Sequence, residues 1–191
     1  MIENVKQQKL AKAKKMMLLF GLLSITMTFA GLTSAYIVSK GRPDWTMDFN
    51  LPSEFFYSTF IIVLSSLTLL ISKRKLTSGK SINSVFNWTL STFILGLIFI
   101  VFQFIGFNNI IDQGYYFAGA QSAIKTSFIY VLSFLHTVHL VAGLIVLSVI
   151  MVNIKKGKYV KNNLGFNLGS NFWHYLDFLW LYLFSFFYFF G

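Results

Sequence analysis

Residues 86–108 read FNWTLSTFILGLIFIVFQFIGFN and contain no charged side chain. An α-helix of this length spans about 35 Å, which exceeds the roughly 30 Å hydrocarbon core of a bilayer. Four other apolar runs have a similar length, at about 16–38, 53–72, 127–153 and 172–190. The sequence therefore predicts an all-α membrane protein, a single domain over 1–191 built as a bundle of five transmembrane helices.

Composition supports a lipid environment and excludes several functional classes. The chain has 191 residues, of which 55% are hydrophobic and only 12% are charged, whereas soluble domains carry roughly 25% charged residues. It contains no cysteine, which excludes disulfides, thiolate metal sites and iron–sulfur clusters. The net charge of +10 does not predict nucleic-acid binding, because the cations lie in short segments between apolar runs.

The distribution of these cations predicts the orientation of the chain. The segment before the first span and the loops after the second and fourth spans carry 13 of the 16 Lys and Arg residues, and the other side carries Lys40, Arg42 and Lys125. Cytoplasmic loops of membrane proteins are enriched in Lys and Arg. We therefore expect a multi-pass protein of the bacterial inner membrane with a cytoplasmic N-terminus and a periplasmic C-terminus.

Ionisable side chains within the spans are costly and need a reason. His136 and His139 lie near the middle of the fourth span on one helical face, while His174 opens the fifth span with Asp177 three residues later. Gln103 lies deep in the third span. We expect these groups to form hydrogen bonds between helices, with His174 and Asp177 as a local pair near the inner interface.

Other chemistries for the histidines are less well supported. A metal site built from all three would need His174 to reach the depth of His136 and His139, and haem ligation would need facing imidazoles at matching depth. A proton path would need carboxylates at successive depths, which the spans lack. No nucleophile with its base and no phosphate loop occurs, so the residues alone predict a non-catalytic membrane subunit.

Smaller polar and small apolar residues predict close helix packing. Ser and Thr in the spans can bond to their own helix or bridge to a neighbour, and small residues allow helices to approach closely. The residues concerned are Ser24, Thr26, Thr28, Ala30, Gly31, Ser65, Ser66, Gly96, Ala142 and Gly143.

Two stretches carry a family resemblance. Residues 134–139 read FLHTVH, with Gly143 one turn later, and residues 173–182 read WHYLDFLWLY. The second is similar to the closing W-H-[FY]-x-D-x-x-W-[LI]-x signature of subunit III of haem–copper oxidases, the cytochrome c oxidase and quinol oxidase type. The first is similar to that family's F-H-G-x-H-V stretch.

The resemblance extends over the chain, with departures. Residues 24–31, SITMTFAG, resemble the family's S-E-x-M-x-F-A-G, and five spans match its short bacterial form. Ile25 stands where the family usually has a membrane glutamate, Gly106 where an acidic residue often occurs, and Thr137 between the paired histidines in place of glycine. The missing carboxylates argue against proton binding or relay at those positions.

The resemblance implies a non-redox subunit of a proton-pumping terminal oxidase in aerobic respiration. Such a subunit holds no haem, copper or catalytic residue. The haem and copper belong to partner subunits. It packs against subunit I beside other oxidase subunits, within a respiratory supercomplex in some cases, binds phospholipid and keeps the enzyme active. The residues carried over as its interhelical and lipid-facing polar set are Gln103, His136, His139, Trp173, His174 and Asp177.

Two rival functions use the same spans. A small transporter or channel would need broken helices or a polar path at mid-membrane. A membrane haem protein would use His136, His139 and His174 as iron ligands.

Overall fold

The computed structural model describes residues 2–42, 45, 52–79, 81–117, 124–160 and 163–190. The described residues form five α-helices and contain no β-strand, so the all-α prediction is confirmed. The elements are α1 (Ile2–Ser39), α2 (Glu54–Thr77), α3 (Ile82–Asp112), α4 (Ile124–Lys155), the short 3₁₀ turn η1 (Lys158–Val160) and α5 (Leu164–Phe190).

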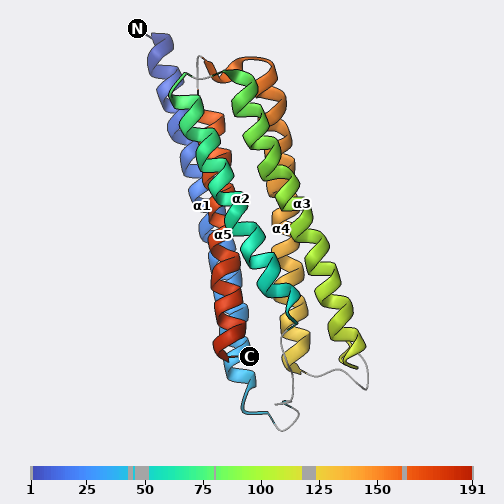
Figure 1. Cartoon of the computed structure of the whole chain (residues 1–191). Helices are drawn as coiled ribbons and strands as arrows, with labels where there is room; N and C mark the ends of the chain where they lie inside the picture. The colour runs from blue at the N-terminus through green and yellow to red at the C-terminus, as the bar shows by residue number, and fades with distance from the viewer. Residues whose placement is uncertain are drawn as a thin grey trace.

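The helices lie side by side and alternate in direction (Figure 1). The N-terminus, the α2–α3 turn and the α4–α5 connection share one end of the bundle, which we call the basic end, and the C-terminus lies at the other end. Helix α5 packs against α1, α2 and α4, whereas α1 contacts only α4 and α5 among the described helices. Helix α5 therefore links α1 to α2, whose described residues do not contact each other.

Four helices are long and apolar enough to cross a membrane: α2, α3, α4 and residues Val5–Ser39 of α1. Helix α5 has 27 residues, but its Trp and Tyr side chains lower its mean hydropathy because each carries a polar atom. The crossing of the membrane by α5 stays a prediction. The end-to-end alternation of the five helices is the arrangement that such a crossing requires (Figure 1).

Helix α5 begins eight residues before the predicted fifth span, at Leu164 rather than at residue 172. Its first turns, LGFNLGSN, resemble a loop by composition, but the glycines there serve packing. A Cβ on Gly169 would lie 2.9 Å from Cγ1 of Val146 in α4, so only glycine permits this approach. The sequence had suggested that Trp173 and His174 lie at the start of the fifth helix. Because α5 begins at Leu164, they lie well inside it.

Candidate functional site

The indole of Trp173 lies at the centre of the bundle. It is completely buried, and its Nε1–H donates a hydrogen bond to Oγ of Ser65 in α2 at 3.1 Å. A Cβ added to Gly96 in α3 would lie 2.7 Å from Cη2 of the indole, and one added to Gly143 in α4 would lie 3.2 Å from its Cε3. The two glycines thus form a slot that receives Trp173, and α5 is fixed against three helices at one point.

A second tryptophan, Trp180, repeats this arrangement two turns later. Its Nε1–H donates to Oγ1 of Thr59 in α2 at 2.9 Å. Its ring stacks on Phe55, with centroids 5.9 Å apart, and meets the edge of Phe99 at 5.0 Å. Both indole N–H groups are therefore satisfied inside an apolar core, which is what burial of tryptophan requires.

Helix α2 presents acceptor oxygens to its neighbours. The hydroxyls of Ser58, Thr59 and Ser65 each donate to a carbonyl of α2 itself, at 2.7–3.0 Å. Their oxygens then accept bonds from other helices, including one from Nε2 of Gln103 to Ser58 at 3.1 Å. Ser65 was predicted to bond to its own helix or to bridge to a neighbour, and it does both. The bond from Gln103 to Ser58 joins α3 to α2.

The paired histidines of α4 contact different neighbours, and among the described residues neither forms the predicted hydrogen bond to another helix. His136 is fully buried and lies 5.1 Å from the Trp180 ring and 5.9 Å from the Phe99 ring. His139 is partly buried, lies 5.8 Å from Phe29 of α1, and has Nδ1 2.7 Å from the carbonyl of Leu135. Because a carbonyl only accepts, Nδ1 of His139 carries a proton.

His174 and Asp177 lie at the contact between α5 and α2. Nδ1 of His174 is 2.7 Å from Oγ of Ser66 and 3.9 Å from Oδ2 of Asp177. Ser66 and Asp177 thus approach the same ring nitrogen of His174. In a hydrolytic Ser-His-Asp triad the serine contacts Nε2, so these three residues do not form one. Because α5 starts at Leu164, His174 and Asp177 lie inside the helix and not at its start, and Asp177 is buried; their predicted position near the inner interface stays a prediction.

The three imidazoles do not converge. His136 faces Trp180 of α5, His139 faces Phe29 of α1, and His174 faces Ser66 of α2. Within the described parts of the chain, no three His, Asp or Glu side chains come together. The alternatives that require a shared iron or other metal therefore have no supporting geometry here.

The departures from the family pattern have a local structural counterpart. A Cβ on Gly106 would lie 2.8 Å from Cε2 of Phe55, so an acidic side chain at 106 would collide with that ring. Ile25 packs against the hydrophobic core of the bundle. Apolar contacts thus occupy the surroundings of both positions.

A set of hydroxyl contacts between α1 and α5 was only partly foreseen. Oγ1 of Thr26 shares a 2.8 Å hydrogen bond with the hydroxyl of Tyr175, and Oγ1 of Thr33 shares one of 2.9 Å with Tyr182. Thr26 was recognised as a bridging candidate, but no hydrogen-bonding role was predicted for the tyrosines. Their i, i+7 spacing on α5, matched by Thr26 and Thr33 on α1, was the available signal.

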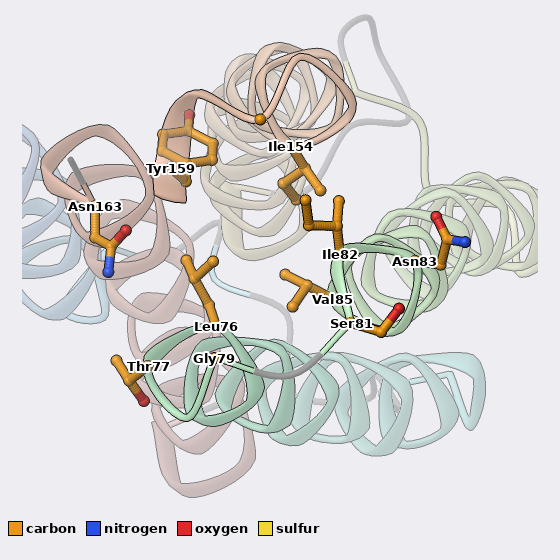
Figure 2. Close-up of a pocket in the computed structure, with 11 residues that line it drawn as sticks. Leu76, Thr77, Gly79, Ser81, Ile82, Asn83, Val85, Ile154, Tyr159 and Asn163 are labelled. Atoms are coloured by element: carbon orange, nitrogen blue, oxygen red, sulfur yellow. The ribbon is translucent and has the colours of Figure 1, made fainter. Parts of the chain in front are cut away.

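A pocket of about 720 Å³ opens at the basic end, away from the polar set. Figure 2 shows Leu76 of α2, Ile82 and Val85 of α3 and Ile154 of α4 pointing toward one another across it. The side chain of Asn163 borders the pocket. Sequence reasoning gave these residues no role, because they lie in connections or at helix ends.

Comparisons with known proteins agree with this arrangement. Residues 6–191 match the family model described as cytochrome c oxidase subunit III. The chain is 32% identical to the cytochrome bo(3) ubiquinol oxidase subunit 3 of Pseudomonas aeruginosa over 172 residues, covering 86% of this chain and 78% of that one. It is 28% identical to the quinol oxidase subunit 3 of Bacillus subtilis, covering 82% and 77%, and 28% identical to the cytochrome c oxidase subunit 3 of Bacillus sp. strain PS3, covering 84% and 77%. The resemblance is confirmed, and the chain belongs to the cytochrome c oxidase subunit III family.

Proposed function

We propose that this chain is the non-redox subunit III of a proton-pumping haem–copper terminal oxidase, which packs on subunit I and keeps the assembled enzyme active. The observation that carries the proposal is the family match over residues 6–191, which includes the tryptophans and histidines of the polar set. Relatives named as quinol oxidase and as cytochrome c oxidase subunits are equally similar, at 28% identity. This supports a role common to both kinds of oxidase.

The proposed topology has five crossings of the bacterial inner membrane, with the basic end in the cytoplasm. It is supported by the alternation of the helices (Figure 1) and by the excess of Lys and Arg at that end. Each helix is continuous over its described length. Transporters of the kind considered as a rival use interrupted helices at the membrane centre, so continuity favours a scaffold.

Bound phospholipid is part of the proposal. An apolar groove of about 390 Å³ lies between α3 and α4, lined by Phe107, Phe117, Tyr130, Val131, Phe134 and Leu135. It suits an acyl chain, which needs no hydrogen bonds. Replacing Val131 with Trp should fill the groove and reduce the phospholipid that co-purifies, whereas Val149→Trp, at an exposed position of α4, should not. Equal lipid content in both variants would remove this part of the proposal.

The decisive experiment is purification through an affinity tag on this chain in mild detergent. We expect chains bearing haem and copper to co-purify at equal stoichiometry, as measured by absorbance and metal analysis. A chain that purifies without them, or that binds haem on its own, would overturn the proposal. Transport in vesicles lacking any oxidase would do the same.

The role in keeping the enzyme active has its own test. The double variant His174→Leu/Asp177→Leu should loosen the subunit from the complex and shorten the working life of the oxidase during continuous turnover, while the initial rate changes less. Loss of the initial rate in an intact complex with its haems in place would contradict this role.

A further inference from the structure

The contact between α2 and α5 contains polar atoms that no hydrogen bond from the described residues satisfies. Both carboxyl oxygens of Asp177, Nε2 of His174 and Oγ of Ser170 are buried and lack a hydrogen-bond partner. These three residues are spaced by four and three positions, so they lie along one face of α5. Unsatisfied buried polar atoms are rare in folded proteins, and four on one face need an explanation.

The carboxyl of Asp177 is the costliest of these groups. Its side chain is only 5% exposed, and its neighbour His174 is at 3.9 Å, too far for a hydrogen bond. Nδ1 of that imidazole already contacts Ser66 at 2.7 Å. Among the described residues, no Lys or Arg forms an ion pair with Asp177. The titratable side chain beside it is that of His174, which is charged only if it is protonated.

An ionised carboxylate in this position would be uncompensated. Burying an unpaired charge costs far more than burying a neutral polar group, and a buried group therefore tends to adopt its neutral form. A neutral carboxylic acid has one donor and several acceptor sites. It would still need partners, and the Ser66 hydroxyl, the neighbouring group on α2 that interacts with the carboxyl, already contacts Nδ1 of His174.

Water can supply those partners. Buried waters in proteins typically make about three hydrogen bonds to polar groups that otherwise lack partners, and Ser170, His174 and Asp177 offer such groups on one face. The side chain of His174 is 23% exposed. On α2, Lys73 lies seven residues from Ser66, two turns closer to the basic end.

We propose that the α2–α5 contact is a hydrated proton-binding site, in which Asp177 holds a proton as a neutral carboxylic acid and internal water joins it to His174 and Ser170. The site is closed by protein around the carboxyl and is reached from the side of His174. No redox step is involved, since the bound species is a proton exchanged with water. The inference depends on this helix contact and not on the oxidase role.

Infrared spectroscopy of the tag-purified full chain, together with the chains that accompany it, tests the site. The difference spectrum between wild type and Asp177→Asn should show the loss of one carbonyl stretch of a protonated carboxylic acid. In the wild type, that band should shift to lower frequency after exchange into D₂O. The matched control is Asp112→Asn, at an exposed position of α3, which should remove no such band.

The outcomes separate the two parts of the inference. If Asp177→Asn removes no protonated-acid band, the carboxyl is ionised and the proposal fails. If the band is present but does not shift in D₂O, water does not reach the site and the hydrated part fails. Should Asp177→Asn not assemble, Ser66→Ala and Ser170→Ala keep the carboxyl and should displace the same band. An unmoved band in both would also contradict the proposed site.

Discussion

The slot for Trp173 predicts opposite effects for two similar substitutions. Gly31 of α1 and Gly96 of α3 are both helical, but an added Cβ at Gly31 meets no atom within 4 Å, whereas at Gly96 it meets Cη2 of Trp173 at 2.7 Å and Cδ2 of Leu144 at 2.9 Å. Trp173 cannot retreat easily, because Ser65 holds its Nε1.

The magnitudes follow from these contacts. Gly31→Ala should stabilise the bundle by up to about 1 kcal/mol through helix propensity. Gly96→Ala has the same gain, but overpacking costs typically about 1–3 kcal/mol, so the net effect is a loss of up to roughly 2 kcal/mol. Trp173→Phe removes Cη2, the atom 2.7 Å from the added Cβ, but leaves Leu144 in place. It should therefore relieve part of the destabilisation caused by Gly96→Ala, with a coupling energy of about 1 kcal/mol between the two substitutions.

The assay is SDS-driven unfolding in mixed micelles, followed by far-UV circular dichroism. It is applied to the chain carrying Gly31→Ala, Gly96→Ala, Trp173→Phe, and the last two together. If Gly96→Ala behaves like Gly31→Ala, or if its effect is the same with Trp and with Phe at position 173, the slot does not constrain the indole and the packing argument is refuted.

Three further outcomes are expected. Trp180→Phe and Thr59→Ala should each cost about 1 kcal/mol in the same unfolding assay, and the double variant should cost less than their sum, because they remove one shared hydrogen bond; additive losses would contradict that bond. Gln103→Leu should cost no more than about 1 kcal/mol, whereas Gln103→Glu should cost clearly more, because its buried carboxyl must either bind a proton at neutral pH or remain an unpaired charge; equal stability of the two would argue against burial of this position. Alkaline phosphatase fused after the C-terminus should be active in cells and inactive when fused after the α2–α3 turn; the reverse pattern would exclude the proposed orientation.

The helices were predictable because lipid imposes a simple rule on sequence. Every backbone polar group must be satisfied within the membrane, so an uncharged run such as 86–108 leaves helix as the available structure. Four of the five predicted spans fall within observed helices, and the second, 53–72, begins one residue before α2 at Glu54. The start of α5 was not predictable in this way, because Gly165 and Gly169 suggest a loop by composition. Only the structure shows that Tyr159 and Val146 pack closely against these glycines.

The polar set was predictable in membership but not in pairing. A polar residue in an apolar run is conspicuous, so Gln103, His136 and His174 could be selected from sequence. Their partners are serine, tryptophan and phenylalanine side chains on other helices, and these residue types are too common in such a chain to be matched without the geometry. Helix spacing placed His136 and His139 on one face of α4, whereas in the bundle His136 lies against α5 and His139 against α1.

The confinement of α1 to contacts with α4 and α5 bears on how the chain is made. A ribosome adds roughly 5–20 residues each second, and Tyr175 follows its partner Thr26 by 149 positions. Helix α1 therefore waits in the bilayer for roughly 7–30 seconds after its own synthesis before that partner exists. Helix α4 is made earlier and also contacts α1, but the hydroxyl contacts with Tyr175 and Tyr182 form only when α5 arrives, so quality control that samples nascent chains meets a first helix that lacks them in each molecule.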